Sequence, residues 1–354
     1  MKKFDFAIGN PPYNEAFADS GDNGNFGAPV YDKFMESAYK VANITELIHP
    51  ARFLFNAGGT DKKWNNKMLN DEHFKVLKYE AKSSNVFANT DIKGGVAITY
   101  YDLSRKFSPI KIFTPFSELN DILHKVMPHI SSDGSMMSEI SGRGVYKLSD
   151  VALTSHPEIE KMQSKGHKKD VGSGAFKKLN NIVFFDQPND NENEWVKFLG
   201  IIKNKRIYKW TPKKFQDVPE SFYNYKVFIP KANGSGALGE ILSTPLIGEP
   251  LIGEPLIGAT ETFLSIGNFK TKEEAENCMR YIKSKFARVM LGVLKITQDN
   301  TKAKWAYVPL QNFTKTSDIN WSKSIQEIDQ QLYKKYNLSD EEIEFIETHV
   351  KEMD

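Results

Sequence analysis

The stretch that decides the fold lies at the start of the chain and reads Phe4-Asp5-Phe6-Ala7-Ile8-Gly9-Asn10-Pro11-Pro12-Tyr13. Apolar side chains stand at every second position from Phe4 to Ile8, which is the period of a β-strand. The two prolines that follow fix the backbone φ angle and prevent a helix directly after the strand. The sequence therefore predicts a strand and then a stiff loop, which presents the residues from Asn10 onward at the carboxyl end of the strand. Ligands bind at that end in open α/β sheets.

The loop offers three groups that suit a flat conjugated ring carrying an amino group. The Asn10 side-chain oxygen and the Pro11 carbonyl can accept the two amino hydrogens, while the Tyr13 ring can stack on the face of the ligand. The alternative interpretation is a Pro-Pro turn that only ends a strand, and the loop by itself favours neither.

The next hundred residues predict helices and strands in alternation. The pattern predicts a helix over 30–41 with Val30, Phe34, Ala38 and Val41 on one face, a buried strand from Thr45 to His49-Pro50, a polar helix after Trp64, a strand over 74–79, and a β-rich segment that follows Gly94-Gly95 and reaches Tyr101. The order strand, helix, strand, helix, strand, strand is that of the second half of a doubly wound α/β sheet.

These segments together resemble the large adenine-N6 DNA methyltransferases of restriction-modification systems, in which one polypeptide carries both catalysis and DNA specificity. The matching motifs are Asn10–Tyr13, His49-Pro50-Ala51-Arg52-Phe53, Val86-Phe87 with Lys93-Gly94-Gly95-Val96-Ala97-Ile98, and more loosely the C-terminal segment 332–346. The tetrapeptide alone also occurs in enzymes that methylate a protein glutamine or ribosomal RNA, so it fixes the acceptor atom and not the polymer.

The resemblance implies roles for particular residues. Asn10, Pro11, Pro12 and Tyr13 would form the catalytic loop, and Tyr13 and Phe87 would stack on the two faces of an adenine flipped out of double-stranded DNA. The methyl donor would be S-adenosylmethionine. The chain would then be an adenine-specific DNA methyltransferase of a restriction-modification system.

The family's S-adenosylmethionine motif, an Asp/Glu-x-Phe-x-Gly-x-Gly loop on strands before the catalytic strand, is absent from this sequence. Only Met1-Lys2-Lys3 precede that strand, and no later glycine cluster lies between a strand and a helix. We expect the cofactor half to come from a separate chain in a hetero-oligomer, because a half-sheet exposes an edge strand and an uncovered apolar face. The alternatives are a non-enzymatic DNA-specificity subunit and a remnant of a longer restriction-methylation enzyme.

A basic stretch rich in aromatic residues predicts where DNA binds. Between Lys197 and Lys231 there are nine Lys or Arg residues against two Asp or Glu residues. Lysine and arginine neutralise phosphates, and aromatic rings pack on bases and sugars. The expected DNA-binding residues are Lys205, Arg206, Lys209, Trp210, Lys213, Lys214 and Lys231. The competing interpretation is a solvated face without a ligand.

The whole chain is predicted to be an α/β protein of three parts. They are a partial methyltransferase catalytic domain over 1–115, a mixed α+β target-recognition domain over 116–310, and a C-terminal helical segment over 311–354. One long amphipathic helix is expected over 271–294, with Cys278 in its packing face and Arg280, Lys283, Lys285 and Arg288 as supplementary phosphate contacts.

A five-residue repeat interrupts the second part, with copies of Pro-Leu-Ile-Gly that begin at Pro245, Pro250 and Pro255. Proline and glycine at this spacing exclude a helix or a central strand, and three copies are too few for a solenoid. We expect the extra copies to loop out without structural consequence.

Composition excludes several classes of protein. The chain has 354 residues, a net charge of +2 and a single cysteine, so it has neither a disulfide framework nor a four-cysteine zinc site. The longest apolar run, 289–294, is too short to span a bilayer, and no signal sequence is present. We expect a cytoplasmic protein with no metal ligands, in which His49 is a structural residue that ends its strand.

Overall fold

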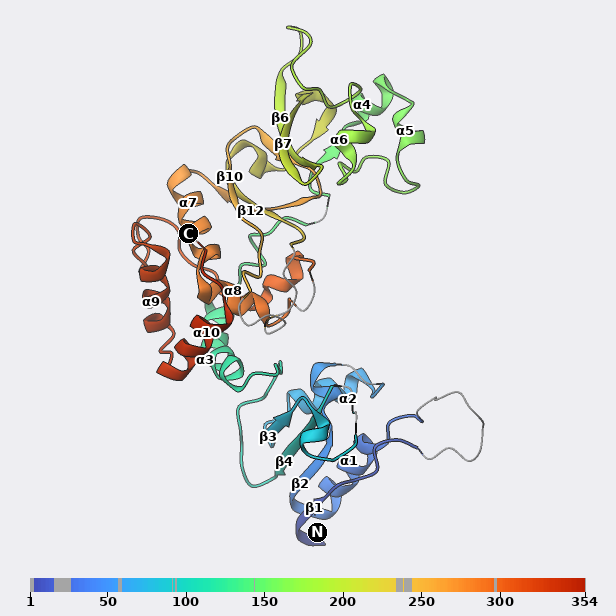
Figure 1. Cartoon of the computed structure of the whole chain (residues 1–354), viewed down its shortest axis with the longest axis vertical. Helices are drawn as coiled ribbons and strands as arrows, with labels where there is room; N and C mark the ends of the chain where they lie inside the picture. The colour runs from blue at the N-terminus through green and yellow to red at the C-terminus, as the bar shows by residue number, and fades with distance from the viewer. Residues whose placement is uncertain are drawn as a thin grey trace. The chain divides into compact units, whose positions relative to one another are not determined.

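The computed structural model describes residues 3–15, 27–56, 59–90, 92, 94–142, 144–233, 238, 244–295 and 298–353. The protein is a mixed α/β chain of several sheets and helices that divides into two compact units, 1–120 and 121–354 (Figure 1). Residues 311–354, for which a separate helical segment was predicted, lie within the second unit. In the described part of the chain, no helix is long and apolar enough to cross a membrane.

Unit 1 is built on one four-stranded sheet. Its elements are β1 (Phe4–Gly9), α1 (Tyr31–Val41), β2 (Ala42–Pro50), α2 (Lys62–Leu69), β3 (Phe74–Glu80) and β4 (Val96–Asp102), with short 3-10 turns at Arg52–Phe55 and Ser83–Asn85. The strand order is β1-β2-β4-β3, with β1 parallel to β2 and both β2 and β3 antiparallel to β4. The predicted order of elements is confirmed. That this sheet is one half of a doubly wound sheet stays a prediction.

One face of this sheet carries the core of unit 1. Helices and loops bring large side chains onto it, including Met35 of α1, Trp64 of α2 and Phe53, and these pack with Leu47 and Ala97 of the central strands. The helical face predicted for α1 is wrong in part. Its fully buried residues are Tyr31 and Met35, whereas Phe34 and Val41 are 46% and 36% exposed.

The opposite face is uncovered at β1. Phe4, Phe6 and Ile8 are 58, 64 and 79% exposed, and they share that face with Ile44 of β2 through the parallel register. β1 also lies at the end of the strand order, so its outer edge has no pairing strand among the residues that the structure describes. Both features were expected of a half-sheet.

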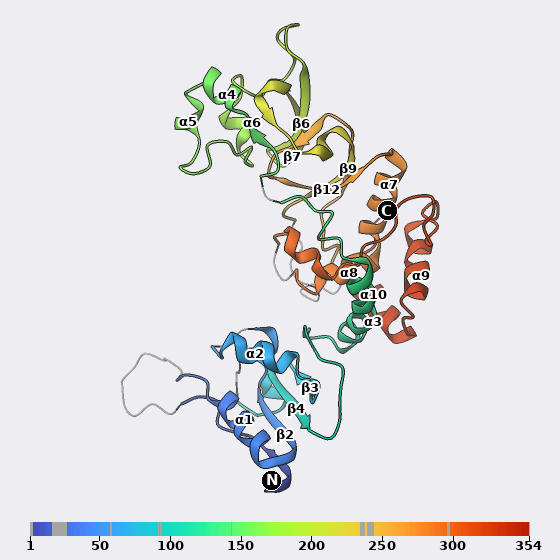
Figure 2. The ribbon, with the colours of Figure 1, turned by 180° about the vertical axis from the view of Figure 1, so that it is seen from behind.

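Unit 2 contains two three-stranded sheets and a two-stranded one. Its strands are β5 (Lys147–Leu148), β6 (Trp195–Ile202), β7 (Lys205–Pro212), β8 (Gln216–Asp217), β9 (Tyr225–Pro230), β10 (Leu251–Gly253), β11 (Ile257–Ala259) and β12 (Phe263–Phe269). The sheet orders are β11-β6-β7, β10-β9-β12 and β5-β8. Figure 2 shows these strands from behind, with α4 (Asp150–Ser155), α5 (Ile159–Met162) and α6 (Ala175–Lys178) beside β6 and β7. Residues from β6, β9, β12 and α6 share one buried apolar cluster.

The Pro-Leu-Ile-Gly repeat is part of these sheets, so the expectation that it loops out is wrong. Its second and third copies form β10 and β11, which are edge strands of two different sheets. A Cβ atom added to any of the three repeat glycines would lie only 2.5–2.8 Å from an atom of a neighbouring ring. The ring belongs to Pro230 at Gly248, to Phe228 at Gly253 and to Phe198 at Gly258. Each copy therefore packs closely in its own environment.

The predicted helix over 271–294 is two helices, α7 (Lys272–Lys283) and α8 (Lys285–Gly292). The break lies at Ser284, whose backbone is extended and whose side chain accepts a hydrogen bond from the Ala287 amide. Asp329 of α9 (Ile325–Lys335) accepts the next two free amides, those of Lys285 and Phe286. Cys278 is fully buried, as predicted. The chain also contains α3 (Ser117–Asp133) and α10 (Asp340–His349).

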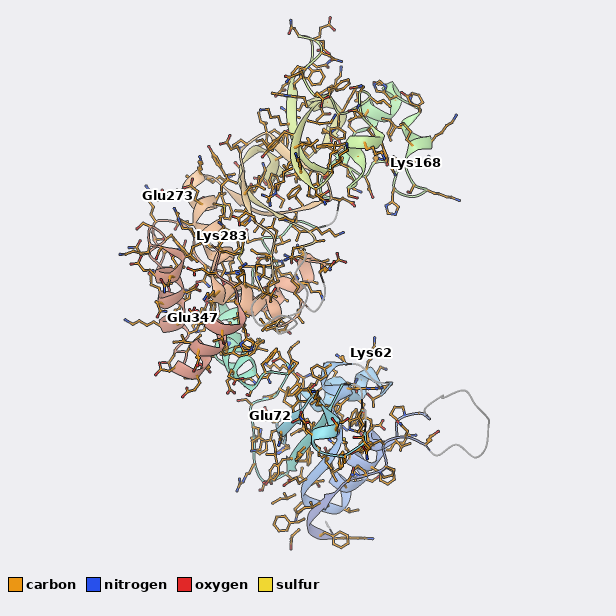
Figure 3. The ribbon with its side chains drawn as sticks, viewed as in Figure 1. Lys62, Glu72, Lys168, Glu273, Lys283 and Glu347 are labelled. Atoms are coloured by element: carbon orange, nitrogen blue, oxygen red, sulfur yellow. The ribbon has the colours of Figure 1, made fainter. Side chains whose placement is uncertain are left out.

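The cations of α7 and α8 are largely engaged within the fold, contrary to their expected role at phosphates. Lys283, labelled in Figure 3, pairs with Glu249 at 2.7 Å, and Lys285 pairs with Glu347. Arg288 is 1% exposed and donates to the carbonyls of Lys283 and Ser284.

Candidate functional site

The strand directions of unit 1 bring the predicted base-binding residues to one edge of the sheet. β1 is parallel to β2, and β2 and β3 are both antiparallel to β4, so these three strands run in the same direction. Their carboxyl ends, at Gly9, Pro50 and Glu80, lie along one edge. Asn10–Tyr13 follows the first of these ends and Phe87 follows the third, so two loops that are far apart in sequence begin at the same edge.

The Asn10–Tyr13 loop is anchored by the segment that precedes α1. The Val30 amide donates to the Tyr13 carbonyl at 3.0 Å, and the Glu15 amide donates to the Ala28 carbonyl at 2.9 Å. Gly27 permits this close approach, because a Cβ atom there would lie 2.3 Å from the Glu15 carbonyl oxygen. Asn10 itself is exposed. The backbone of the loop is thus fixed while the Asn10 amide faces solvent.

Tyr13 combines a fixed backbone with an unpaired side-chain hydroxyl. The residue is half-buried, and its hydroxyl has no hydrogen-bond partner among the described residues. Burial raises the pKa of Tyr13, and the neighbouring Asn10 side chain acts in the opposite direction. The phenol is therefore neutral at physiological pH. The hydroxyl itself is enclosed, so the aromatic face is the part of the side chain that a ligand at the loop would contact.

Phe87 lies in a loop that is held by the side chains of two small residues. The Phe87 amide donates to the Ser83 carbonyl at 2.8 Å, and the Thr90 hydroxyl donates to the Phe87 carbonyl at 2.7 Å. The Ser83 hydroxyl in turn accepts from the Ile92 amide at 2.8 Å. The ring is half-buried and has no aromatic neighbour within the described part of unit 1. A fixed backbone and a ring without a stacking partner suit a stacking platform.

His49 is the structural residue that the sequence predicted. It is fully buried, and burial lowers its pKa to about 4, so the ring is neutral. Its Nδ1 donates to the Pro50 carbonyl at 3.2 Å, which leaves Nε2 to accept from the Thr99 hydroxyl at 2.7 Å. The Tyr31 ring stacks on it at 5.7 Å. The sequence did not indicate that Thr99 and Tyr31 contact His49, because only β-pairing and tertiary packing bring these residues together.

The predicted DNA-binding residues of unit 2 fall into two groups. Lys209 and Lys213 are engaged within the fold: Lys209 is 5% exposed, pairs with Asp186 at 3.0 Å and donates to Asn180, while Lys213 pairs with Glu194 at 3.0 Å. Lys209 therefore stabilises the β7 strand from inside. Side chains alternate between the two faces of a strand, and Lys209 lies on the face of β7 that is turned towards the core.

The second group faces solvent or is half-exposed. Lys205 and Lys214 are exposed, and Lys231 is half-buried. Arg206 is exposed, donates to the Glu249 carbonyl and lies over the Phe263 ring at 5.8 Å from its centre. The half-buried Trp210 ring lies 4.6 Å below the Lys197 ammonium. Residues 234–237, the glycine-rich end of the basic stretch, lie outside the described residues.

Comparison with known proteins gives a family match over the first quarter of the chain and a weak structural likeness over nearly all of it. Among solved structures, the chain is similar to the type IIG restriction endonuclease BpuSI, with 12% identity, a TM-score of 0.32, and coverage of 98% of this chain and 54% of that one. This chain thus spans about half the length of that protein. No curated protein matches. Residues 1–87, which contain both the Asn10–Tyr13 loop and Phe87, match the Eco57I restriction-modification methylase family.

Proposed function

We propose that the chain provides the target-base half of an adenine-N6 DNA methyltransferase of a restriction-modification system. The observation that carries this proposal is the methylase family match over 1–87, within which the Asn10–Tyr13 loop and Phe87 begin at one edge of the sheet. The exposed Asn10 side chain and the half-buried Tyr13 ring support the proposal, because they offer a hydrogen-bond acceptor and a stacking face to an amino-bearing base.

The amino group of adenine needs activation because its lone pair is delocalised into the ring. Hydrogen bonds from its two hydrogens to the Asn10 side-chain oxygen and the Pro11 carbonyl draw the nitrogen towards tetrahedral geometry. The lone pair is then localised on nitrogen and directed at the methyl carbon. The loop contributes positioning and electrostatic stabilisation of the positive charge that develops on nitrogen.

The two aromatic side chains hold the base in place. Adenine in a duplex is inaccessible, so it must rotate out of the stack before it reaches the loop. Tyr13 stacks on one face and Phe87 on the other, and each replaces part of the stacking that the base loses. Pro12 keeps the loop rigid, so that Asn10 and Tyr13 retain their relative orientation without a large entropic cost.

S-adenosylmethionine supplies an electrophilic methyl group on a sulfonium, and we propose that a partner chain binds it. The exposed apolar face of β1, with Phe4, Phe6 and Ile8, and its unpaired edge form the surface for that partner. The side chains that contact the partner therefore belong to the same strand whose end presents Asn10. Docking on this strand places the cofactor next to the catalytic loop.

Unit 2 is proposed to recognise the DNA sequence. Its exposed cations, Lys205, Arg206, Lys214 and the half-buried Lys231, would contact phosphates, with Trp210 packing beside them. Lys209 and Lys213 would hold the edge of this surface through ion pairs to the exposed carboxylates of Asp186 and Glu194. Phosphate contacts position the protein on DNA, and fewer neutral or bidentate side chains would distinguish the bases.

The test uses the complex that copurifies with a tagged form of this chain from its host. Asn10→Ala should reduce methyl transfer from labelled S-adenosylmethionine to duplex DNA by at least about 100-fold while DNA binding is retained. Asn43→Ala, which removes an exposed amide on β2, is the matched control and should keep full activity. Full activity in Asn10→Ala would overturn the mechanism. Sequence-specific binding without any methyl transfer would favour a DNA-specificity subunit instead.

A further inference from the structure

An arginine stands at the sheet edge where the two proposed base-binding loops begin. Arg52 is the first residue of the 3-10 turn Arg52–Phe55, which follows the carboxyl end of β2 after a single residue. In the strand order β1-β2-β4-β3, this position lies between the Asn10–Tyr13 loop, which follows β1, and the loop that carries Phe87 from β3 to β4. The methyl transfer proposed above gives this cation no role.

Two glycines allow the Arg52 side chain to pack at this edge. Gly94 and Gly95 precede β4, and their φ angles of 87° and 74° lie in the left-handed region that favours glycine. A Cβ atom on Gly94 would lie 2.8 Å from the Cγ atom of Arg52, so the aliphatic part of the arginine packs directly on the Gly94 backbone. The Ala51 amide donates to the Gly95 carbonyl at 3.0 Å, which ties the end of β2 to the start of β4. The stem of Arg52 is therefore held against the last residues of the Phe87 loop.

The charged end of Arg52 lies within electrostatic range of Tyr31. Burial raises the pKa of Tyr31 to about 12, and the Arg52 charge acts in the opposite direction. Tyr31 follows Val30, whose amide donates to the Tyr13 carbonyl at 3.0 Å. The half-buried arginine thus adjoins both loops, with its stem on the end of the Phe87 loop and its charge near the segment that anchors the Asn10–Tyr13 loop.

A base that is held between two aromatic rings brings its own backbone to the rim of the site. The nucleotide stays linked to a phosphate on each side when it rotates out of the duplex. A guanidinium carries five N–H donors in a planar fork that matches a phosphate, so it can bind a phosphate while it also donates to another group. Because the stem of Arg52 is already packed, little side-chain entropy is lost when such a contact forms.

We propose that Arg52 binds a phosphate that flanks the target adenine, while the base lies between Tyr13 and Phe87. This inference rests on the proposed function and adds to it a contact with the backbone of the flipped nucleotide. The contact stabilises the flipped nucleotide relative to the stacked one, because Arg52 lies at the edge that the base reaches only after it has left the duplex.

The test titrates a short duplex, in which 2-aminopurine lies opposite an abasic site, with the full chain. The fluorescence of 2-aminopurine changes when the base leaves the stack. Its amino group is not the one that the Asn10 loop would hold, so its binding does not depend on that contact. In two further probes an uncharged methylphosphonate replaces the phosphate on one or the other side of the 2-aminopurine. On one of the two sides, the replacement should raise the half-saturating concentration by about tenfold.

Three variants assign this methylphosphonate penalty to the arginine. Arg52→Gln should abolish the penalty, because the charge that binds the phosphate is gone. Arg52→Lys keeps the charge without the fork and should reduce the penalty to about threefold. Arg105→Gln is the matched control: it removes an exposed arginine that pairs with Asp102 at the carboxyl end of β4, on the opposite edge of the sheet, and should keep the full penalty. A purely structural role of Arg52 would weaken the binding of all probes alike.

The inference is overturned if the penalty in Arg52→Gln equals that of the unsubstituted chain, or if the unsubstituted chain shows no penalty on either side. Melting temperatures show whether each variant is folded. If Arg52→Gln does not fold, Arg52→Lys decides in its place, and a full penalty there overturns the inference. Asn10→Ala should keep the penalty. The absence of any fluorescence change would contradict the base-binding role of the Asn10–Tyr13 loop itself, so the two failures are distinguishable.

Discussion

The two units differ in how completely they bury their own apolar strands. In unit 1 one face of the sheet is packed, yet Phe6 at the centre of β1 is 64% exposed. In unit 2, by contrast, Phe198 of strand β6 is fully buried. Its ring centre lies 5.5–6.3 Å from those of three aromatic neighbours. Unit 2 is therefore closed by its own residues, whereas unit 1 presents a surface that resembles a core cut open. The partner proposed to dock on β1 would account for this difference.

The largest expected effect compares the same substitution in the two units. Phe198→Ala should lower the free energy of unfolding of unit 2 by about 3–5 kcal/mol, because it leaves a cavity in a packed cluster. Phe6→Ala should change the stability of the isolated chain by no more than about 0.5 kcal/mol, because the ring is already in water. Chemical denaturation of the two variants measures both. Equal losses would show that β1 is covered within this chain.

The pH dependence of stability should have opposite signs in the two units. Burial lowers the pKa of His49 from 6.5 to about 4, so unit 1 is most stable above pH 6.5 and loses roughly 3 kcal/mol as the pH falls to 4. Burial raises the pKa of Asp329 in unit 2 from 3.8 to about 6, so its contribution is greatest below pH 3.8 and is lost by about pH 6.

Denaturation at a series of pH values checks both signs, with His49→Gln and Asp329→Asn as the variants that should remove each dependence. Hydrogen exchange resolved by residue assigns each transition to its unit. If His49→Gln keeps the loss of stability on acidification, another group in unit 1 is responsible for it.

A smaller effect is expected from the repeat, whose glycines pack closely against rings of unit 2. Gly253→Ala should destabilise unit 2 by about 1–3 kcal/mol, because the new Cβ would lie 2.5 Å from the Phe228 ring. Gly172→Ala, which has no heavy atom within 4 Å of the added Cβ, is the control and should be tolerated. Thermal unfolding compares the two. A neutral Gly253→Ala would mean that the repeat is held loosely.

The smallest effect concerns the exposed cations of unit 2. Lys205→Ala and Lys214→Ala should each weaken binding to all DNA sequences alike and reduce the slope of log affinity against log salt by about 0.9. Lys209→Met should instead lower stability and leave that slope unchanged, because the Lys209 side chain is buried and its ammonium already pairs with Asp186. Binding isotherms at several salt concentrations distinguish the two outcomes. A reduced slope in Lys209→Met would mean that this ion pair opens on DNA.

Local patterns predicted the element order of unit 1 but not every buried face. The alternation from Phe4 to Ile8 and the helix after Val30 appear as β1 and α1. The buried face of α1 was misassigned, because Phe34 and Val41 are apolar yet exposed in an open unit. Apolar character predicts burial only when the covering surface is present in the same chain.

Structural features that depend on residues distant in the sequence were harder to predict. The break at Ser284 depends on Asp329, which lies on another helix and accepts the amides of Lys285 and Phe286. The Asn10–Tyr13 loop could be recognised from the sequence because its four residues are contiguous, so that no tertiary contact is needed to assemble them; its catalytic role stays a prediction.

The proposed reaction requires the Asn10 loop of unit 1 to act on adenine in DNA. Single-molecule sequencing of genomic DNA tests it most directly, in a host that carries the gene in its native context. We expect N6-methyladenine in one fixed sequence motif, its loss in Asn10→Ala and its retention in Asn43→Ala. Unchanged adenine methylation at that motif in Asn10→Ala would show that the Asn10 loop does not catalyse the transfer.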